Sequence, residues 1–367
     1  MWRVPSRPLL AWTAVFPVLV AACGGGTAPA TPPKLADAAR SVAQLRSVSA
    51  PTSTQLFRSF TFLAPYFFRT DSTPIIPVRA LVLPPLQRWS LPRTVPLPAP
   101  RSQGMSHGLG AARFPPGTLG KTFVWDTTAK GYVASTDPGA PANGARFVVY
   151  LTAQGPLLPV QPSLPLTPLG YVDLTDRSTG GNAVVGITLV GTAGATTATY
   201  ADYTLAGPPP GGVEFTESLA GYVTDGLTRL DLTSAFTSTL SALTTHTTAD
   251  VAGQDVHVVE TVSFAAAAAV ELSPDFSLTS AGETVRAMGS FVVDTVAQTA
   301  GGSFAVTVNG RPFATVTLGL HGAGYAAAPG VTLDAADEEA LAALVSGSFG
   351  LFGLVLSLTL PGLVLGV

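Results

Sequence analysis

The sequence predicts a mainly β protein: a large antiparallel meander, forming a curved sheet, half-barrel or barrel, with an apolar C-terminal helix and a Pro-rich N-terminal arm. Three observations predict this fold. From about residue 118, segments rich in β-branched and aromatic residues follow one another at short spacing. No helical pattern separates them, which disfavours βαβ units. The last 28 residues contain no charged side chain.

Composition excludes several classes of protein. Charged residues make up 11% of the 367, whereas about 25% is usual. The 19 Lys and Arg face 22 Asp and Glu, a balance that does not suit a nucleic-acid binder. The single cysteine, Cys23, excludes a disulfide within the chain and a cysteine-based metal site.

The N-terminus carries the strongest motif. Arg3 and Arg7 precede Leu9–Val20, an apolar stretch that is shorter than the roughly 20 residues of a transmembrane helix. It has the size of the hydrophobic region of a signal peptide. The stretch ends in Val20-Ala21-Ala22-Cys23, which resembles the lipobox of bacterial lipoproteins.

This resemblance implies cleavage before Cys23, acylation of its thiol and of the new amino group, and firm anchoring in a membrane. Gly24, where some lipoproteins carry an Asp that retains them at the inner membrane, implies sorting to the outer membrane. We therefore expect a lipid-anchored protein of the bacterial cell envelope, facing the periplasm or the cell surface. The alternative is an ordinary secretory signal that contains a chance cysteine.

The chain divides into five predicted regions. A flexible tether and a short helix follow the signal peptide, and twelve prolines between Pro51 and Pro116 exclude a continuous helix or central strand in the next region. That region is nevertheless rich in aromatic residues, from Phe57 to Trp89, so we expect it to pack on its own sheet or on a neighbour. The boundaries are 1–22 (signal peptide), 23–50 (tether and helix), 51–117 (aromatic arm), 118–333 (antiparallel β domain) and 334–367 (apolar helix or tail).

Charge is unevenly distributed between the two halves of the chain. Residues 23–150 contain thirteen Lys or Arg and four Asp, whereas residues 151–367 contain four Arg and eighteen Asp or Glu. A basic arm beside an acidic domain has two explanations. Either the arm docks on its own domain, or it lies near anionic lipid headgroups beside the anchor.

The strands of the β domain are predicted from composition and alternation. In Leu227–Phe236, for example, Leu230 and Leu232 point to one face, and Arg229 and Asp231 point to the other. At Asn309-Gly310-Arg311, the apolar pattern favours a three-residue loop over a two-residue turn, with Val306 on the face of Ala314. The predicted strands are Lys121–Trp125, Gly131–Ser135, Arg146–Leu151, Tyr171–Leu174, Ala183–Val190, Thr196–Leu205, Val213–Val223, Leu227–Phe236, Val256–Phe264, Val285–Val296, Phe304–Val308 and Phe313–Leu318.

The C-terminal helix is predicted to begin after Asp334, an N-cap residue followed by acidic side chains. The segment Phe349–Leu360 is almost wholly apolar, and Pro361-Gly362 interrupts it. Its length would admit a membrane span. Its glycines and the absence of flanking basic residues favour burial inside the protein.

Patterns that would carry catalysis are absent from the sequence. It contains no Gly-x-Ser-x-Gly elbow, no phosphate-binding loop and no His-Glu-x-x-His motif. We expect structural or incidental roles for His107, His246, His257 and His321. On a strand, His257 and Glu260 would lie on opposite faces and could not share a metal. Asp173 and Asp176 are interpreted as part of a polar turn and not as a calcium site.

These observations predict a non-enzymatic protein without a cofactor or metal, in which Cys23 is the one functional residue that can be named. Its partners are the membrane, through the lipid anchor, and an apolar ligand or an envelope protein; nucleic acid is not among them. A wide sheet with an apolar helix is similar in architecture to envelope lipid carriers, which suggests binding of an apolar ligand in a β cradle. Two alternatives stay open: an assembly lipoprotein that binds a partner through the aromatic arm, and a hydrolase with dispersed catalytic residues.

Overall fold

The computed structural model describes most of the chain beyond residue 32. The described residues belong to the compact unit that begins at Pro33. They are 33–35, 38–68, 79–82, 94–97, 114–115, 117–152, 161–179, 182–194, 196–207, 215–239, 242–266, 269–294, 297, 299–319 and 322–365.

A single 15-stranded sheet dominates the fold and confirms the predicted antiparallel meander. Neighbouring strands are antiparallel except for one parallel pair, β3 and β5, and the sheet is open, with β17 and β4 at its edges. A second sheet pairs β1 (Arg79–Val82) with β2 (Thr94–Leu97). The strands of the large sheet are β3 (Lys121–Asp126), β4 (Gly131–Ser135), β5 (Gly144–Tyr150), β6 (Pro168–Asp176), β7 (Ala183–Ala193), β8 (Thr196–Gly207), β9 (Phe215–Thr224), β10 (Arg229–Ser238), β11 (Ala242–Val251), β12 (His257–Ala266), β13 (Val270–Ser280), β14 (Glu283–Asp294), β15 (Thr299–Val308), β16 (Arg311–Gly319) and β17 (Gly322–Ala327).

The two faces of the sheet differ in polarity because side chains alternate along each strand. In β10, Leu230 and Leu232 are buried, while Asp231 and Thr233 face outward, as the sequence predicted. The outward face is rich in hydroxyl groups, which bond one another across strands; Thr233 and Thr248, for example, are 2.7 Å apart. One face is therefore solvated, and the other forms the core.

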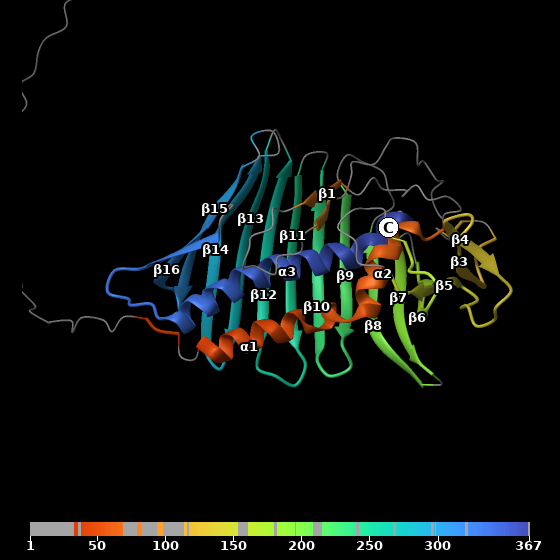
Figure 1. Ribbon diagram of the computed structural model, residues 1–367, viewed down its shortest axis with the longest axis horizontal. Coiled ribbons are helices and arrows are strands. Elements are labelled where there is room, and N and C mark those ends of the chain that lie inside the picture. Colours follow the sequence, from red (N-terminus) through yellow and green to blue (C-terminus); the bar gives the residue numbers. More distant parts are fainter. Residues whose placement is uncertain are drawn as a thin grey trace, which may run out of the picture. The chain divides into compact units, whose positions relative to one another are not determined.

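Three helices cover the inner face (Figure 1). They are α1 (Ala38–Ser49), α2 (Gln55–Leu63) and α3 (Ala335–Leu365), and α1 and α3 run side by side across the strands. Short 3₁₀ turns, Ala50–Ser53 and Ala64–Tyr66, flank α2. A two-layer arrangement of sheet and helices results, with the core between the layers.

The first part of the aromatic arm packs on the chain's own sheet. Phe67, fully buried, stacks on Phe147 of β5 with 4.3 Å between ring centroids, and its ring also lies 5.7 Å from Tyr132 of β4. Phe60 of α2 contacts Phe67, and Tyr66 meets Trp125 of β3 edge to face. Residues 55–68 thus belong to the core of the β domain, while Trp89 lies outside the described residues.

Helix α3 begins as predicted and ends later than predicted. The Asp334 carboxylate accepts hydrogen bonds from the backbone N–H groups of Ala336 and Asp337, each at 2.9 Å. The expected interruption at Pro361-Gly362 is wrong, because the helix continues to Leu365. Pro361 lies in the last turns, where its missing N–H removes one hydrogen bond, and it is buried.

The hairpin between β15 and β16 has a shorter loop than predicted, but Val306 pairs with Ala314 as predicted. Asn309 and Gly310, with φ angles of 48° and 76°, form a two-residue turn, and Val308 pairs with Arg311. The predicted three-residue loop is therefore wrong. A bulge after Val306 inserts one extra residue into β16, so that Val306 still pairs with Ala314 on the inner face.

Candidate functional site

The predicted lipid-attachment residue, Cys23, lies outside the described residues, so acylation stays a prediction. Within the described unit, two places could hold a binding site. One is the inner face of the sheet, which the sequence predicted to be a cradle for an apolar ligand. The other is the surface formed by the three helices.

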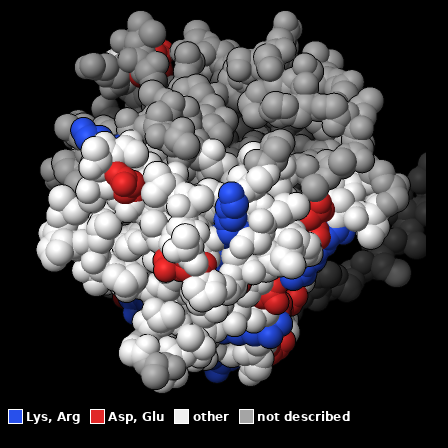
Figure 2. Space-filling model, turned by 90° about the vertical axis from the view of Figure 1, so that its right-hand side faces the viewer, with Lys and Arg blue, Asp and Glu red and all other residues white. Residues whose placement is uncertain are grey.

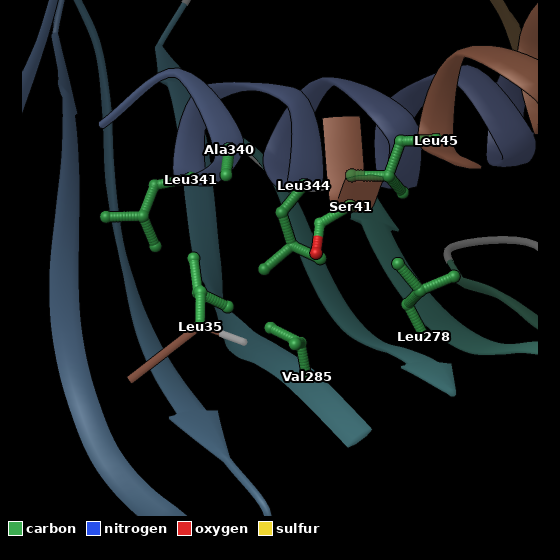
Figure 3. A pocket seen from close by; sticks show the side chains of 8 residues that line it. All are labelled: Leu35, Ser41, Leu45, Leu278, Val285, Ala340, Leu341 and Leu344. Carbon is green, nitrogen blue, oxygen red and sulfur yellow. The ribbon is translucent and has the colours of Figure 1, made fainter. Parts of the chain in front are cut away.

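Helix α3 fills the expected cradle. The segment Ala335–Gly362 of α3, with a mean hydropathy of 2.0, is long and apolar enough to cross a membrane. However, 67% of its apolar stretch of 18 residues is buried inside the protein. Figure 3 shows leucines of α1 and α3 meeting Leu278 of β13 and Val285 of β14. The space left among them is about 10 Å³, room for about one water molecule. A ligand larger than a water molecule does not fit at this position.

A polar contact fixes α3 on the sheet. Glu260 of β12 is fully buried, and the Ser348 hydroxyl of α3 donates to its Oε1 at 2.5 Å. Its Oε2 has no hydrogen-bond partner among the described residues. Burial raises the pKa of the Glu260 carboxyl to about 8, although the hydrogen bond from Ser348 acts in the opposite direction. Farther along the helix, the Tyr203 hydroxyl donates to the Leu358 carbonyl at 3.0 Å.

A groove of about 560 Å³ lies on the helical surface, between α3 on one side and α1 and α2 on the other. It extends along α3 from Glu339 to Ser357, about 27 Å at the rise of an α-helix. Its lining is mostly apolar or small, since α1 and α2 contribute Val42, Leu45 and Phe57, and α3 contributes Ala342, Ala343 and Leu354.

Small residues form the floor of the groove. Ser346, Gly347, Gly350, Gly353 and Ser357 follow at helical spacing on the face of α3 that looks away from the sheet. At Gly347, an added Cβ would lie 3.1 Å from Leu45, so this glycine allows α1 and α3 to approach closely. At Gly350, no atom lies within 4 Å of an added Cβ. The groove is therefore open over Gly350.

Two arginines border the groove. Arg46 of α1 forms an exposed ion pair with Glu339 of α3 at 3.0 Å. Arg58 of α2 donates through Nε to the Ser53 carbonyl at 3.1 Å, and its NH2 group bonds the same oxygen. No carboxylate in the described part of the chain pairs with Arg58. The groove thus combines an apolar floor with a net positive rim.

The histidines singled out in the sequence stand apart from this groove. His246 and His257 lie on the outward face of the sheet, where their Nδ1 atoms contact Thr261 at 3.0 Å and Asp250 at 2.7 Å, respectively. Glu260 faces inward, on the side opposite His257, as predicted. His107 and His321 lie outside the described residues. Within the described ranges, no group of three or more His, Cys, Asp or Glu could hold a metal ion.

The interpretation of Asp173 and Asp176 as a turn is wrong, because both belong to strand β6. Asp173 accepts two hydrogen bonds from Arg146, each of 2.7 Å, and the guanidinium of Arg146 also lies over the ring of Tyr171. Pairs of a basic and an acidic side chain, such as Arg146 and Asp173, are typical of this protein, in which charged residues are few. Figure 2 shows most of the described surface at the β3–β4 end as uncharged, with acidic and basic side chains scattered among each other.

Sequence reasoning missed the groove because α1 and α2, which form one wall, precede the sheet, whereas α3, which forms the other, follows it. One signal was present: serine and glycine recur every three or four residues from Ser346 to Ser357, which places small side chains on one face of a helix. Comparison with known proteins adds no candidate, because no family model, curated protein or solved structure matches this chain.

Proposed function

We propose that this protein is a non-enzymatic, lipid-anchored protein of the bacterial envelope that binds the apolar chain of a lipid-like ligand in the groove beside α3. The observation that carries this proposal is the groove itself, about 560 Å³ with a glycine-lined floor. Ligand sites are typically concave, mostly apolar and bordered by a few polar groups. Because α3 fills the cradle, we place the ligand site on the helical surface and not on the inner face of the sheet.

The shape of the groove supports a long and narrow ligand. Glycines without side chains let a hydrocarbon chain lie close to the backbone of α3, which lengthens the contact along the helix. Each CH₂ group that leaves water contributes about 0.8 kcal/mol. A chain in this groove would also contact Phe57 and Leu354. The alternative of an assembly lipoprotein has no such observation in its favour, since the described arm residues pack on their own sheet.

The proposed anchor keeps the groove near a membrane. Only 14 residues, 24–37, separate Cys23 from the start of α1, and a fully extended tether of that length reaches about 50 Å at most. Helix α1 forms one wall of the groove. A lipid that leaves the bilayer would therefore have a short path to the site.

The anchor is tested by Cys23→Ser. We expect the acylated N-terminal peptide of the mature protein to be absent from this variant, because no thiol remains at position 23 to accept the acyl chains. The measurement is fractionation together with mass spectrometry of the N-terminal peptide. Ser47→Ala serves as the matched control and should stay with the membrane. A wild-type N-terminal peptide without the mass of acyl chains would count against the anchor.

The groove is tested by Gly350→Leu. The leucine side chain would occupy the open space above α3, so we expect at least tenfold weaker binding of phosphatidylglycerol with two oleoyl chains, measured by native mass spectrometry from detergent. Helix propensity favours Leu over Gly by up to about 1 kcal/mol, so the variant should fold. Ala336→Leu adds the same side chain to α3 outside the groove and should bind like the wild type. Equal binding by all three proteins would contradict the proposed site.

A further inference from the structure

We infer that the groove selects a lipid with a single negative charge, whose phosphate binds Arg58 while its chain lies along α3. The inference rests on the proposed function and deepens it, because it names the class of ligand. Three features of the described residues carry it: the free donors of Arg58, the net charge of the rim, and the order of polar and apolar groups across the groove.

Arg58 has more hydrogen-bond donors than its contacts with the described residues use. A guanidinium carries five N–H donors in a planar fork. One N–H of Nε and one of NH2 bond the carbonyl oxygen of Ser53, which fixes the plane of the guanidinium relative to α2. Among the described residues the Arg58 guanidinium makes no other hydrogen bond, so its other N–H groups are left for an oxygen ligand. Arginine binds phosphate through two parallel, charge-assisted hydrogen bonds, and Ser53 holds the fork in place for such a contact.

The rim of the groove carries one uncompensated positive charge among the described residues. Arg46 and Glu339 neutralise each other at 3.0 Å, whereas Arg58 has no carboxylate partner there. A phosphodiester headgroup such as phosphatidylglycerol carries one negative charge and complements this rim. A zwitterionic headgroup would bring its own ammonium to the same arginine and gain less.

The groove has polar groups at one place and apolar groups beside them, as a lipid has a polar headgroup beside an apolar chain. Arg58 and Thr61 are neighbours on one face of α2 and line the groove. Phe57, on the same helix, is buried, and Leu354 of α3 is buried as well. A phosphate at Arg58 therefore places the attached chain directly over apolar side chains and the glycines of α3.

The test compares dioleoyl phosphatidylglycerol with dioleoyl phosphatidylcholine, which have the same chains and differ in headgroup charge. The full chain in detergent is titrated with each lipid and analysed by native mass spectrometry. We expect the wild type to prefer phosphatidylglycerol about fivefold, the ratio that one basic side chain contributes near an anionic headgroup. Arg58→Gln should lose the preference and bind both lipids as the wild type binds phosphatidylcholine.

Arg58→Lys and Arg286→Gln complete the design. Arg58→Lys retains the charge and should retain part of the preference, and it replaces Arg58→Gln if that variant fails to fold. Arg286 pairs with Asp275 on the outward face of the sheet, so Arg286→Gln should behave as the wild type. Equal affinity of the wild type for both lipids, or a preference that survives in both Arg58 variants, overturns the inference and leaves the proposed function intact. Binding of neither lipid overturns both.

Discussion

Glu260→Gln is expected to remove the contribution of this carboxyl to the pH dependence of α3 docking and to stabilise the protein at alkaline pH. Burial raises the pKa of Glu260 from 4.5 to about 8. Between these two values the folded state holds a proton that the unfolded state releases, so the free energy of unfolding falls as pH rises through that window. Above about pH 8 no further loss occurs, because both states are then ionised.

The size of this effect follows from the pKa shift. At about 1.4 kcal/mol for each pH unit, the window corresponds to a loss of the order of 5 kcal/mol for the wild type. The neutral amide of Gln keeps an acceptor for Ser348 and carries no proton to lose. Its neighbours in register, Thr247 of β11 and Phe276 of β13, do not ionise in this range, so the difference between the two proteins reports on position 260.

Urea unfolding at pH 5 and pH 9 measures this difference. We expect Glu260→Gln and the wild type to agree within about 1 kcal/mol at pH 5, since each has a neutral side chain there. At pH 9 the variant should be more stable by several kcal/mol. Glu271→Gln, at an exposed position of neighbouring β13, is the matched control and should follow the wild type. Parallel pH curves for Glu260→Gln and the wild type would show that the carboxyl is ionised, or hydrated, in the native protein.

Phe67→Ala has the other large expected effect, a loss of about 3–5 kcal/mol in the free energy of unfolding. The ring of Phe67 is fully buried and stacks on Phe147, and it also contacts Phe60 and Tyr132. Truncation would leave a cavity between the arm and strands β4 and β5. Aromatic pairs of this kind contribute about 0.5–1.5 kcal/mol beyond the burial of area.

Phe62→Ala is the matched control, because this ring lies on α2 at a half-buried position and should cost clearly less. Urea unfolding measures both variants, and proteolysis of residues 55–68 reports on the arm directly. We expect Phe67→Ala to release the arm to proteases before the sheet unfolds. Equal stability of the two variants would mean that the arm does not belong to the core. In that case the hypothesis of a partner for the aromatic arm would regain its motivation.

The fold class was predictable because alternation acts locally. The alternation of Leu230 and Leu232 with Arg229 and Asp231 is enough to predict strand β10. Strand β11 was missed, since its inner face includes the buried hydroxyls of Thr245 and Thr247 in place of apolar side chains. The Thr247 hydroxyl bonds Ser234 at 2.8 Å, a compensation across strands that no single segment displays.

Strand β13 was missed for a different reason. Pro274 argues against a central strand, but the ladder with β14 passes from Leu272 directly to Asp275 and leaves Pro274 without a partner on that side. The groove escaped prediction entirely, because its walls join Phe57 to Leu354, and their proximity depends on packing of the whole unit. The lipobox, by contrast, is read from four consecutive residues and needs no fold.

The place of α3 in the chain has a consequence for biosynthesis. Every strand of the sheet precedes residue 335, so the ribosome completes all of them before it makes α3, the last of the three helices that cover them. Strands that pair with their sequence neighbours can form hairpins as the chain emerges, but only α1 and α2 are available to cover their inner face until α3 follows. Uncovered apolar surface of this extent favours aggregation. The time between the last strand and the last turn of α3 is therefore the interval in which a newly made chain most needs protection by a chaperone.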